Sequence, residues 1–184
     1  MRVDINVMAF LVLVFIWLFA IRQQDKNDIL NRIFIYMIVI TMVNLVLDTA
    51  ACAVDGKAGQ LALVANYTLN MMLFSCGPVL MLAWCLFVDF WIFRSIRRIR
   101  KKAAMLTIPL VVNFLIVVST PLSGLVFSID AANVYARGPG FYIPIGLSYL
   151  LITYSVVFTA IHGKNLKRDE FFLLLFFSVP SWIG

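Results

Sequence analysis

The sequence predicts an all-α fold, a polytopic bundle of transmembrane helices. The chain of 184 residues is 63% hydrophobic and only 13% charged, whereas soluble domains usually carry about 25% charged residues. Long apolar runs alternate with short gaps, and the gaps after the first, third and fifth runs hold twelve of the fifteen Lys and Arg residues. Because short cytoplasmic loops retain Lys and Arg, this alternation indicates an N-terminus outside the cell membrane and basic loops in the cytoplasm.

The first apolar run, residues 5–21, is typical of a membrane span rather than of a cleaved signal peptide. Asp4 offsets the charge of Arg2, and Arg22 follows the run directly. Secretory signal peptides combine a positively charged start with a small-residue cleavage site, and no such cleavage site is present in this run. We therefore expect the run to remain in the protein as its first span.

Five further runs predict five further spans, since a bilayer core needs about 20 apolar residues per helix. The six spans are expected at about residues 5–21, 29–54, 60–93, 103–128, 141–161 and 170–184. The run 60–93 is too long for one straight crossing, so its N-terminal part should project or tilt.

The sixth run reaches Gly184 in apolar sequence without a flanking charge. We expect the chain to be a fragment: a single transmembrane domain over residues 1–184 that holds six of seven helices, the last one truncated. A seventh span would bring the chain back to the cytoplasm and would place any C-terminal domain there.

Several functional classes are disfavoured. The net charge of +6 lies in loops beside a membrane, so we expect no nucleic acid partner. The three cysteines lie inside predicted spans without metal-ligand spacing, and an odd count does not indicate a disulfide framework. The sequence has no glycine-rich phosphate loop and no catalytic triad pattern around its lone histidine, His162. We expect no catalytic residues, no metal and no cofactor in this part of the protein.

Polar residues within the second and third spans form the first candidate ligand site. Asn44 and Asp48 are four residues apart on one helical face, and Asn66 and Asn70 repeat this spacing. Counting from the short outer loop places Asp48 beside Asn66, and Asn44 beside Asn70, one turn deeper. The four residues form either an interhelical polar clamp or the floor of a ligand pocket open to the outside, and an ionisable group in a span favours the pocket.

The outer loop from Asp130 to Gly140 is the second candidate. Tyr135 and Arg137 offer stacking, hydrogen bonding and a positive charge on the side that basic residues avoid. The alternative is a turn in which Arg137 pairs with Asp130 or with lipid headgroups. On the inner side, the run from Arg94 to Lys102 is a topological signal or a site for anionic lipid. We expect Asp89 to pair with Arg94 or with another basic residue nearby.

The stretch Leu122 to Pro144 resembles a loop of the seven-helix N-terminal sensor found in bacterial signalling proteins. That family often carries a phrase of the form fsID-x-x-n-x-Y-x-RGP there. This chain matches it at Ile129, Asp130, Asn133, Tyr135, Arg137, Gly138 and Pro139. The following residues, Gly163 to Pro180, are similar to the next basic loop and helix of the family, and Asn44-x-x-x-Asp48 also fits its style.

The resemblance implies a sensory input domain that regulates a cytoplasmic output domain, most commonly a GGDEF diguanylate cyclase and otherwise a histidine kinase. An extracytoplasmic small molecule or membrane signal would favour one packing of the helices. The last span would pass the change to a homodimer formed by the output domains. A small-solute transporter and a rhodopsin-like light receptor are the alternatives from other classes.

Overall fold

The computed structural model describes residues 2–23 and 28–178, and the chain within these ranges is an all-α bundle. Five helices are long and apolar enough to cross a membrane. They are α1 (Arg2–Gln23), α2 (Ile29–Val54), α3 (Gln60–Phe93), α4 (Ile96–Val118) and α6 (Tyr142–His162). The predicted fold class is therefore confirmed, and the protein is a multi-pass membrane protein.

The shorter elements connect these helices. One-turn helix α5 (Thr120–Ser123) leads into a two-stranded antiparallel hairpin of β1 (Phe127–Ile129) and β2 (Tyr135–Arg137). A 3-10 turn, η1 (Gly163–Asn165), joins α6 to helix α7 (Arg168–Ser178). The predicted sixth span, 170–184, begins within α7, and its residues 179–184 lie outside the described part of the chain.

The predicted span 103–128 differs from the observed helix at both ends. Helix α4 already begins at Ile96, because the Arg and Lys residues of the basic run are good helix formers. It ends at Val118, where α5 follows with Pro121 in its first turn, and Gly124 (φ 62°) then ends α5 in the left-handed conformation. The residues from Phe127 onward, predicted as the end of a span and a loop, form the hairpin instead.

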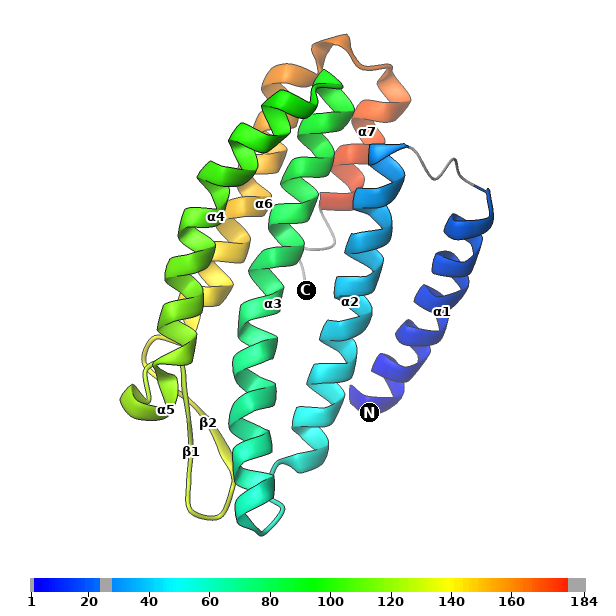
Figure 1. Ribbon diagram of the computed structural model, residues 1–184. Helices are drawn as coiled ribbons and strands as arrows, with labels where there is room; N and C mark the ends of the chain where they lie inside the picture. The colour runs from blue at the N-terminus through cyan, green and yellow to red at the C-terminus, as the bar shows by residue number, and fades with distance from the viewer. Residues whose placement is uncertain (1, 24–27, 179–184) are drawn as a thin grey trace.

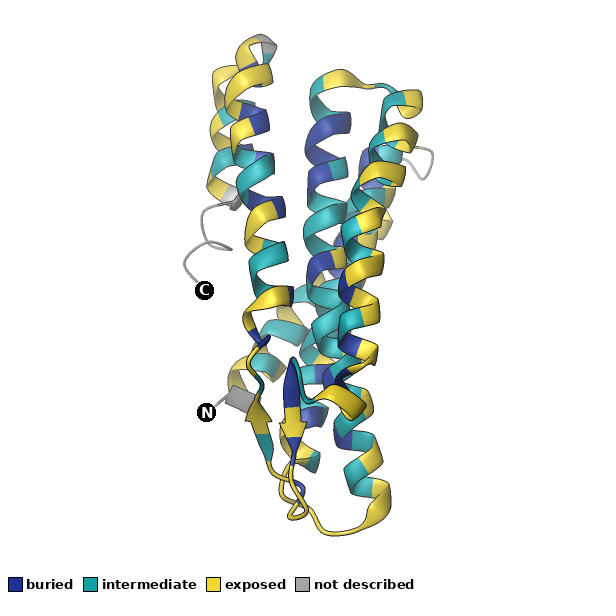
Figure 2. Ribbon diagram, turned by 90° about the vertical axis from the view of Figure 1, so that its left-hand side faces the viewer, coloured by how far each residue is buried: buried dark blue, intermediate teal, exposed yellow. Residues whose placement is uncertain are grey.

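Helix α3 lies at the centre of the bundle and packs against α2, α4 and α6, while α1 stands at the margin against α2 (Figure 1). Buried residues face the inside of the bundle and exposed residues cover its outside (Figure 2). Much of that outside is apolar; Phe15 of α1 and Phe176 of α7 are both 73% exposed. Such a surface is stable in hydrocarbon and costly in water, which is consistent with lipid as the solvent of these helices.

The two ends of the bundle differ in character. At one end, here called the basic end, lie the C-terminus of α1 with Arg22, the α3–α4 connection with the Arg94–Lys102 run, and the α6–α7 connection (Figure 1). At the other, the hairpin end, lie the α2–α3 turn and the β1–β2 hairpin. With 34 residues, α3 measures about 51 Å, well beyond a hydrocarbon core of about 30 Å. Its length agrees with the expectation that a straight crossing is too short for this helix, and its N-terminal part lies at the hairpin end.

Each end has its own buried cluster. At the basic end, Phe87, Val88 and Phe90 of α3 pack with Leu30, Met37, Phe158 and Leu174. At the hairpin end, Val117 of α4 packs with Val126, Phe127 and Ile129. The second cluster fixes the hairpin against the bundle and so positions the polar groups described next.

Candidate functional site

The turn of the hairpin is closed by side-chain hydrogen bonds. Asp130 Oδ1 accepts hydrogen bonds from the backbone N–H groups of Ala132 (2.9 Å) and Val134 (2.8 Å), and Asn133 adopts the left-handed conformation (φ 61°) that asparagine tolerates better than most residues. At the far end of β2, a Cβ on Gly138 would overlap the backbone carbonyls of Gly124 and Leu125. Asp130, Asn133 and Gly138, three of the residues that match the family motif fsID-x-x-n-x-Y-x-RGP, thus each help to set the backbone conformation of the hairpin.

Asn133 fastens the hairpin to the α2–α3 turn. Its Nδ2 donates to the carbonyl oxygens of Val54 and Lys57, each at 2.9 Å. Its Oδ1 accepts from Asn66 Nδ2 (3.0 Å). Asp55 Oδ1 adds a bond on either side, accepting from the backbone N–H of Tyr135 (2.9 Å) and from Asn66 Nδ2 (3.1 Å). Helix α3, the turn and the hairpin are therefore held as one unit through buried Asn66.

A cavity of about 390 Å³ opens beside this unit, between α2, α3 and the hairpin. Its polar lining comes from Asp48, Asp55, Asn66, Asn70, Tyr135 and Arg137. Its apolar wall includes Leu73, Phe74 and Phe141. Five of the six candidate residues taken from the sequence thus line one cavity; the sixth, Asn44, is partly buried in α2 and does not line it.

The hydrogen bonds of these residues differ from the predicted pairs. Asp48 Oδ2 accepts from Asn6 Nδ2 of α1 at 2.8 Å, rather than from Asn66. Asn70 Nδ2 donates to Asn66 Oδ1 at 2.8 Å, rather than to Asn44. Two asparagines four residues apart on one helix are close enough to bond directly. Helix α1 offers Asp48 a donor that counting of depths along α2 and α3 does not include.

Asn6 was not recognised from the sequence, although it is the polar contact that ties α1 to the site. Besides Asp48, its amide donates to Thr49 Oγ1 at 3.2 Å. Asn6 is a polar residue near the start of the first apolar run, and this position is the feature of the sequence that could have identified it. Most of the apolar surface of α1 is exposed, so these hydrogen bonds add a polar contact to a helix with little buried surface.

Tyr135 and Arg137 stand where the cavity meets the hairpin. The ring of Tyr135 stacks on Phe127 with centroids 5.8 Å apart, and Arg137 lies 4.5 Å from the centroid of Phe141. Burial raises the pKa of the Tyr135 phenol above its ordinary value, and the positive charge of Arg137 opposes this only in part. At neutral pH the phenol is therefore a neutral hydroxyl. The lining of the cavity thus holds the carboxylates of Asp48 and Asp55 and the guanidinium of Arg137.

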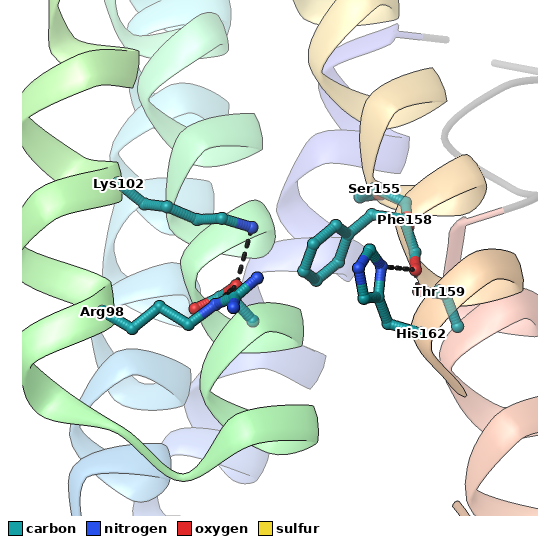
Figure 3. A network of polar contacts seen from close by, with 7 residues as sticks. Arg98, Lys102, Ser155, Phe158, Thr159 and His162 are labelled. Carbon is teal, nitrogen blue, oxygen red and sulfur yellow. Dashed lines mark hydrogen bonds and ion pairs between the residues drawn. The ribbon is translucent and has the colours of Figure 1, made fainter. Parts of the chain in front are cut away.

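A second polar cluster lies at the basic end (Figure 3). Asp89 is fully buried, and its Oδ1 contacts Arg98 Nε at 3.0 Å and Lys102 Nζ at 2.6 Å. The expectation that Asp89 pairs with a nearby basic residue is thus confirmed, with Arg98 and Lys102 of α4 as its partners. Lys102 Nζ also lies 3.4 Å from the ring centroid of Phe158 in α6, so the cluster joins α3, α4 and α6.

His162 lies beside this cluster, and its neighbours are not those of a metal-binding or catalytic histidine. Its Nδ1 lies 3.2 Å from the carbonyl oxygen of Phe158, and its ring packs on Phe158 at 4.5 Å between centroids. Figure 3 shows the Phe158 ring between Lys102 and His162. Within residues 2–23 and 28–178, no group of three or more His, Cys, Asp or Glu side chains could hold a metal ion.

The arrangement can bind a small polar molecule at the hairpin end and can hold helices together at the basic end. Comparisons of the chain with protein-family models, with curated proteins and with solved structures find no match. The geometry of the cavity is therefore the basis for assigning a role to this protein.

Proposed function

We propose that this chain is the membrane-embedded input domain of a bacterial signal-transduction protein, and that the cavity at the hairpin end receives a small polar solute from outside the cytoplasmic membrane. The single observation that carries the proposal is that Asp48, Tyr135 and Arg137, from distant parts of the sequence, line one cavity. A purely structural clamp would not need a cavity of about 390 Å³ beside it. The opposite charges of Asp48 and Arg137 suit a solute with both a cationic and an anionic group.

The contacts around the cavity suggest how occupancy would be transmitted. A cationic group that binds Asp48 competes with Asn6 for the carboxylate and so weakens the tie between α1 and α2. An anionic group that binds Arg137 pulls on a hairpin that Asn133 and Asn66 fasten to α3. A solute that binds more tightly to one packing of the helices than to another shifts the population toward the first packing, by the ratio of the two affinities.

The resemblance of the 122–180 region to bacterial seven-helix sensors supports a cytoplasmic output domain for the full-length protein. We place the basic end in the cytoplasm, because short cytoplasmic loops retain Lys and Arg. A GGDEF diguanylate cyclase is the output that the resemblance favours, and a histidine kinase input domain is the alternative. The open reading frame distinguishes them: a G-G-D/E-E-F motif supports the cyclase, and a phosphoacceptor-histidine domain supports the kinase.

The test is the replacement Asp48→Ala in the full-length protein, with Asn44→Ala as the matched control. Both positions lie on α2 one turn apart, and only Asp48 lines the cavity. Allosteric coupling usually changes a response by about fivefold or more. We expect Asp48→Ala to change the output, read as cellular cyclic di-GMP or as autophosphorylation, by at least about fivefold, and Asn44→Ala to leave it near the wild-type level.

An output that Asp48→Ala leaves unchanged, from protein inserted at wild-type levels, would remove the cavity from signalling. Reporter fusions provide a second check, because export of a fusion at Arg98 or retention of a fusion at Tyr135 contradicts the proposed orientation. A transporter is the remaining candidate, since Pro78 and Pro109 lie inside α3 and α4 and interrupted helices suit alternating access. Solute uptake by vesicles that contain only this protein would favour the transporter.

A further inference from the structure

The hydrogen-bond ladder of α3 is interrupted near the middle of the helix, at Pro78. Proline has no backbone N–H, so the carbonyl oxygen four residues earlier, at Phe74, cannot receive its helical hydrogen bond. An unsatisfied carbonyl inside a bilayer is costly, and neighbouring helices usually supply the missing donor. The partner of the Phe74 oxygen therefore determines how this part of α3 is held.

That donor comes from α4, which packs beside α3 (Figure 1). Asn113 Nδ2 donates to the carbonyl oxygen of Phe74 at 3.3 Å. Asn113 is only 3% exposed, and its Oδ1 has no hydrogen-bond partner among the residues that the structure describes. An apolar side chain would avoid the cost of that unpaired oxygen, so packing alone does not account for an asparagine at this position. The bond to the carbonyl that Pro78 frees does account for it.

The sequence around Pro78 allows α3 to bend there. The residue before a proline is restricted partly by its Cβ, and Gly77 has none. A Cβ at Gly77 would meet nothing closer than Ser148 Oγ at 3.9 Å, so crowding by a neighbour does not require the glycine. Ser75 Oγ donates to the carbonyl oxygen of Met71 at 2.8 Å, a bond that often bends helices. Sharp kinks in helices occur at such combinations of proline, glycine and serine.

The two parts of α3 on either side of Pro78 are anchored to different elements. The part at the hairpin end is held by Asn66, whose Nδ2 donates to Asn133 Oδ1 of the hairpin at 3.0 Å. The part at the basic end is held to α6 by Cys85, whose Sγ donates to the carbonyl oxygen of Leu151 at 3.2 Å. Asp89 also holds this part to two cations of α4. A bend at Pro78 can therefore move one part against the other without breaking either set of contacts.

We propose that Gly77-Pro78 is a hinge of α3 and that Asn113 is the positioning residue that latches it. While the Asn113 amide binds the Phe74 carbonyl oxygen, α3 keeps the conformation described above. When this bond opens, the part of α3 at the hairpin end tilts about Pro78. The ring of Phe74 lines the solute cavity and stacks on Phe127 with centroids 5.7 Å apart, so a solute that displaces this ring also disturbs the latched carbonyl. This last link rests on the proposed function, whereas the hinge and its latch do not.

The experiment measures distances in the full-length protein in nanodiscs by double electron–electron resonance. Spin labels on non-canonical residues leave the native cysteines unlabelled. A label at Leu61 of α3 is paired in turn with one at Leu115 of α4 and one at Ile161 of α6, all three exposed positions. Leu61 lies about 26 Å from Pro78 along the helix axis, so a bend of about 20° moves it by about 9 Å. We expect Asn113→Leu to add a displaced population to these distances that the wild type lacks.

Pro78→Ala provides the specific test, because it restores a backbone N–H for the Phe74 oxygen. In that background Asn113→Leu should leave the distances unchanged, a non-additivity that a merely structural role of Asn113 would not produce. Asn31→Leu makes the same change at another buried asparagine. It is the matched control and should leave the distances at wild-type values. If Asn113→Leu alone does not accumulate in the membrane, adding Pro78→Ala should restore its accumulation.

Four results would overturn the proposal: unchanged distances in Asn113→Leu, the same displacement in the Pro78→Ala background, the same displacement in Asn31→Leu, or accumulation that Pro78→Ala does not restore. None of these measurements uses a solute or the output of the protein. A failure of the hinge is therefore distinguishable from a failure of the Asp48→Ala test of the proposed function.

Discussion

Replacing Asp89 by Asn removes a carboxylate that neutralises two basic side chains inside the bundle. Asp89 is 1% exposed at its side chain, and its partner Lys102 is 15% exposed. Breaking a buried ion pair by removing one partner costs about 3–5 kcal/mol, because the remaining charge stays buried without compensation. The other partner, Arg98, is 37% exposed and can turn toward water. The ring of Phe158 continues to stabilise the Lys102 ammonium. We therefore expect the loss to lie near the lower limit, about 3 kcal/mol.

The measurement is reversible unfolding of the protein in mixed micelles with increasing SDS, followed by tryptophan fluorescence. Asp169→Asn, at an exposed position in the first turn of α7, is the control and should change stability by less than about 0.5 kcal/mol. The double variant Asp89→Asn with Lys102→Met removes the stranded charge as well. Because an apolar replacement of a buried pair is often neutral, the double variant should recover most of the loss.

Two results would refute this reasoning. A loss below about 1 kcal/mol for Asp89→Asn would mean that the pair behaves like an exposed one. A double variant no more stable than the single one would mean that the unpaired ammonium is not the source of the cost, since coupled residues should show non-additive effects.

The remaining predictions concern the hairpin end. Asn133→Ala removes two hydrogen bonds to carbonyls of the α2–α3 turn and places Ala at φ 61°; we expect a loss of about 2–3 kcal/mol, measured by the same SDS titration, and faster proteolysis of the hairpin. Tyr135 has a raised pKa, so its contribution is complete below the unfolded pKa of about 10 and is lost as pH rises through the folded value. Tyr135→Phe should therefore reduce the drop in Tm between pH 9 and pH 11, and an unchanged drop would contradict the burial of this phenol. Asn6→Ala frees Asp48 and should loosen α1 by about 1 kcal/mol, seen as weaker crosslinking between cysteines placed on α1 and α2 while α3–α4 crosslinking stays the same.

Sequence reasoning located the spans because apolar length and charge are local signals. Helices α2 and α3 begin and end where the apolar runs do. The same reasoning placed the start of α4 too late. Hydropathy assigns the run of Arg and Lys to a loop, whereas these residues favour a helical backbone, and the helix includes them. The hairpin was missed because two strands of three residues have too few positions to show alternation.

Five of the six predicted residues line the cavity, whereas Asn44 does not and Asp55 was missed; the hydrogen bonds among them were not predicted. Depth along an antiparallel pair of helices brought Asp48, Asn66 and Asn70 together, and the composition of the outer loop added Tyr135 and Arg137. The hydrogen-bond partners come from segments that counting along two helices cannot reach. Asn6 lies 42 residues from Asp48, and Asn133 lies 67 residues from Asn66.

The length of α3 has a mechanical consequence. Asn66 is embedded near one end of this helix and Asp89 near the other, and they are separated by about 35 Å along the axis. Pro78 lies between these two levels and removes one backbone hydrogen bond of α3, so a displacement at the Asn66 level can reach the Asp89 level along the helix or be taken up as a bend at Pro78. At that level Asp89 contacts Arg98 and Lys102 of α4, so a displacement of α3 there would also move α4. One helix thus carries a polar contact near each of its two ends, and the hinge position between them at Pro78 decides whether a displacement at one surface is reproduced at the other.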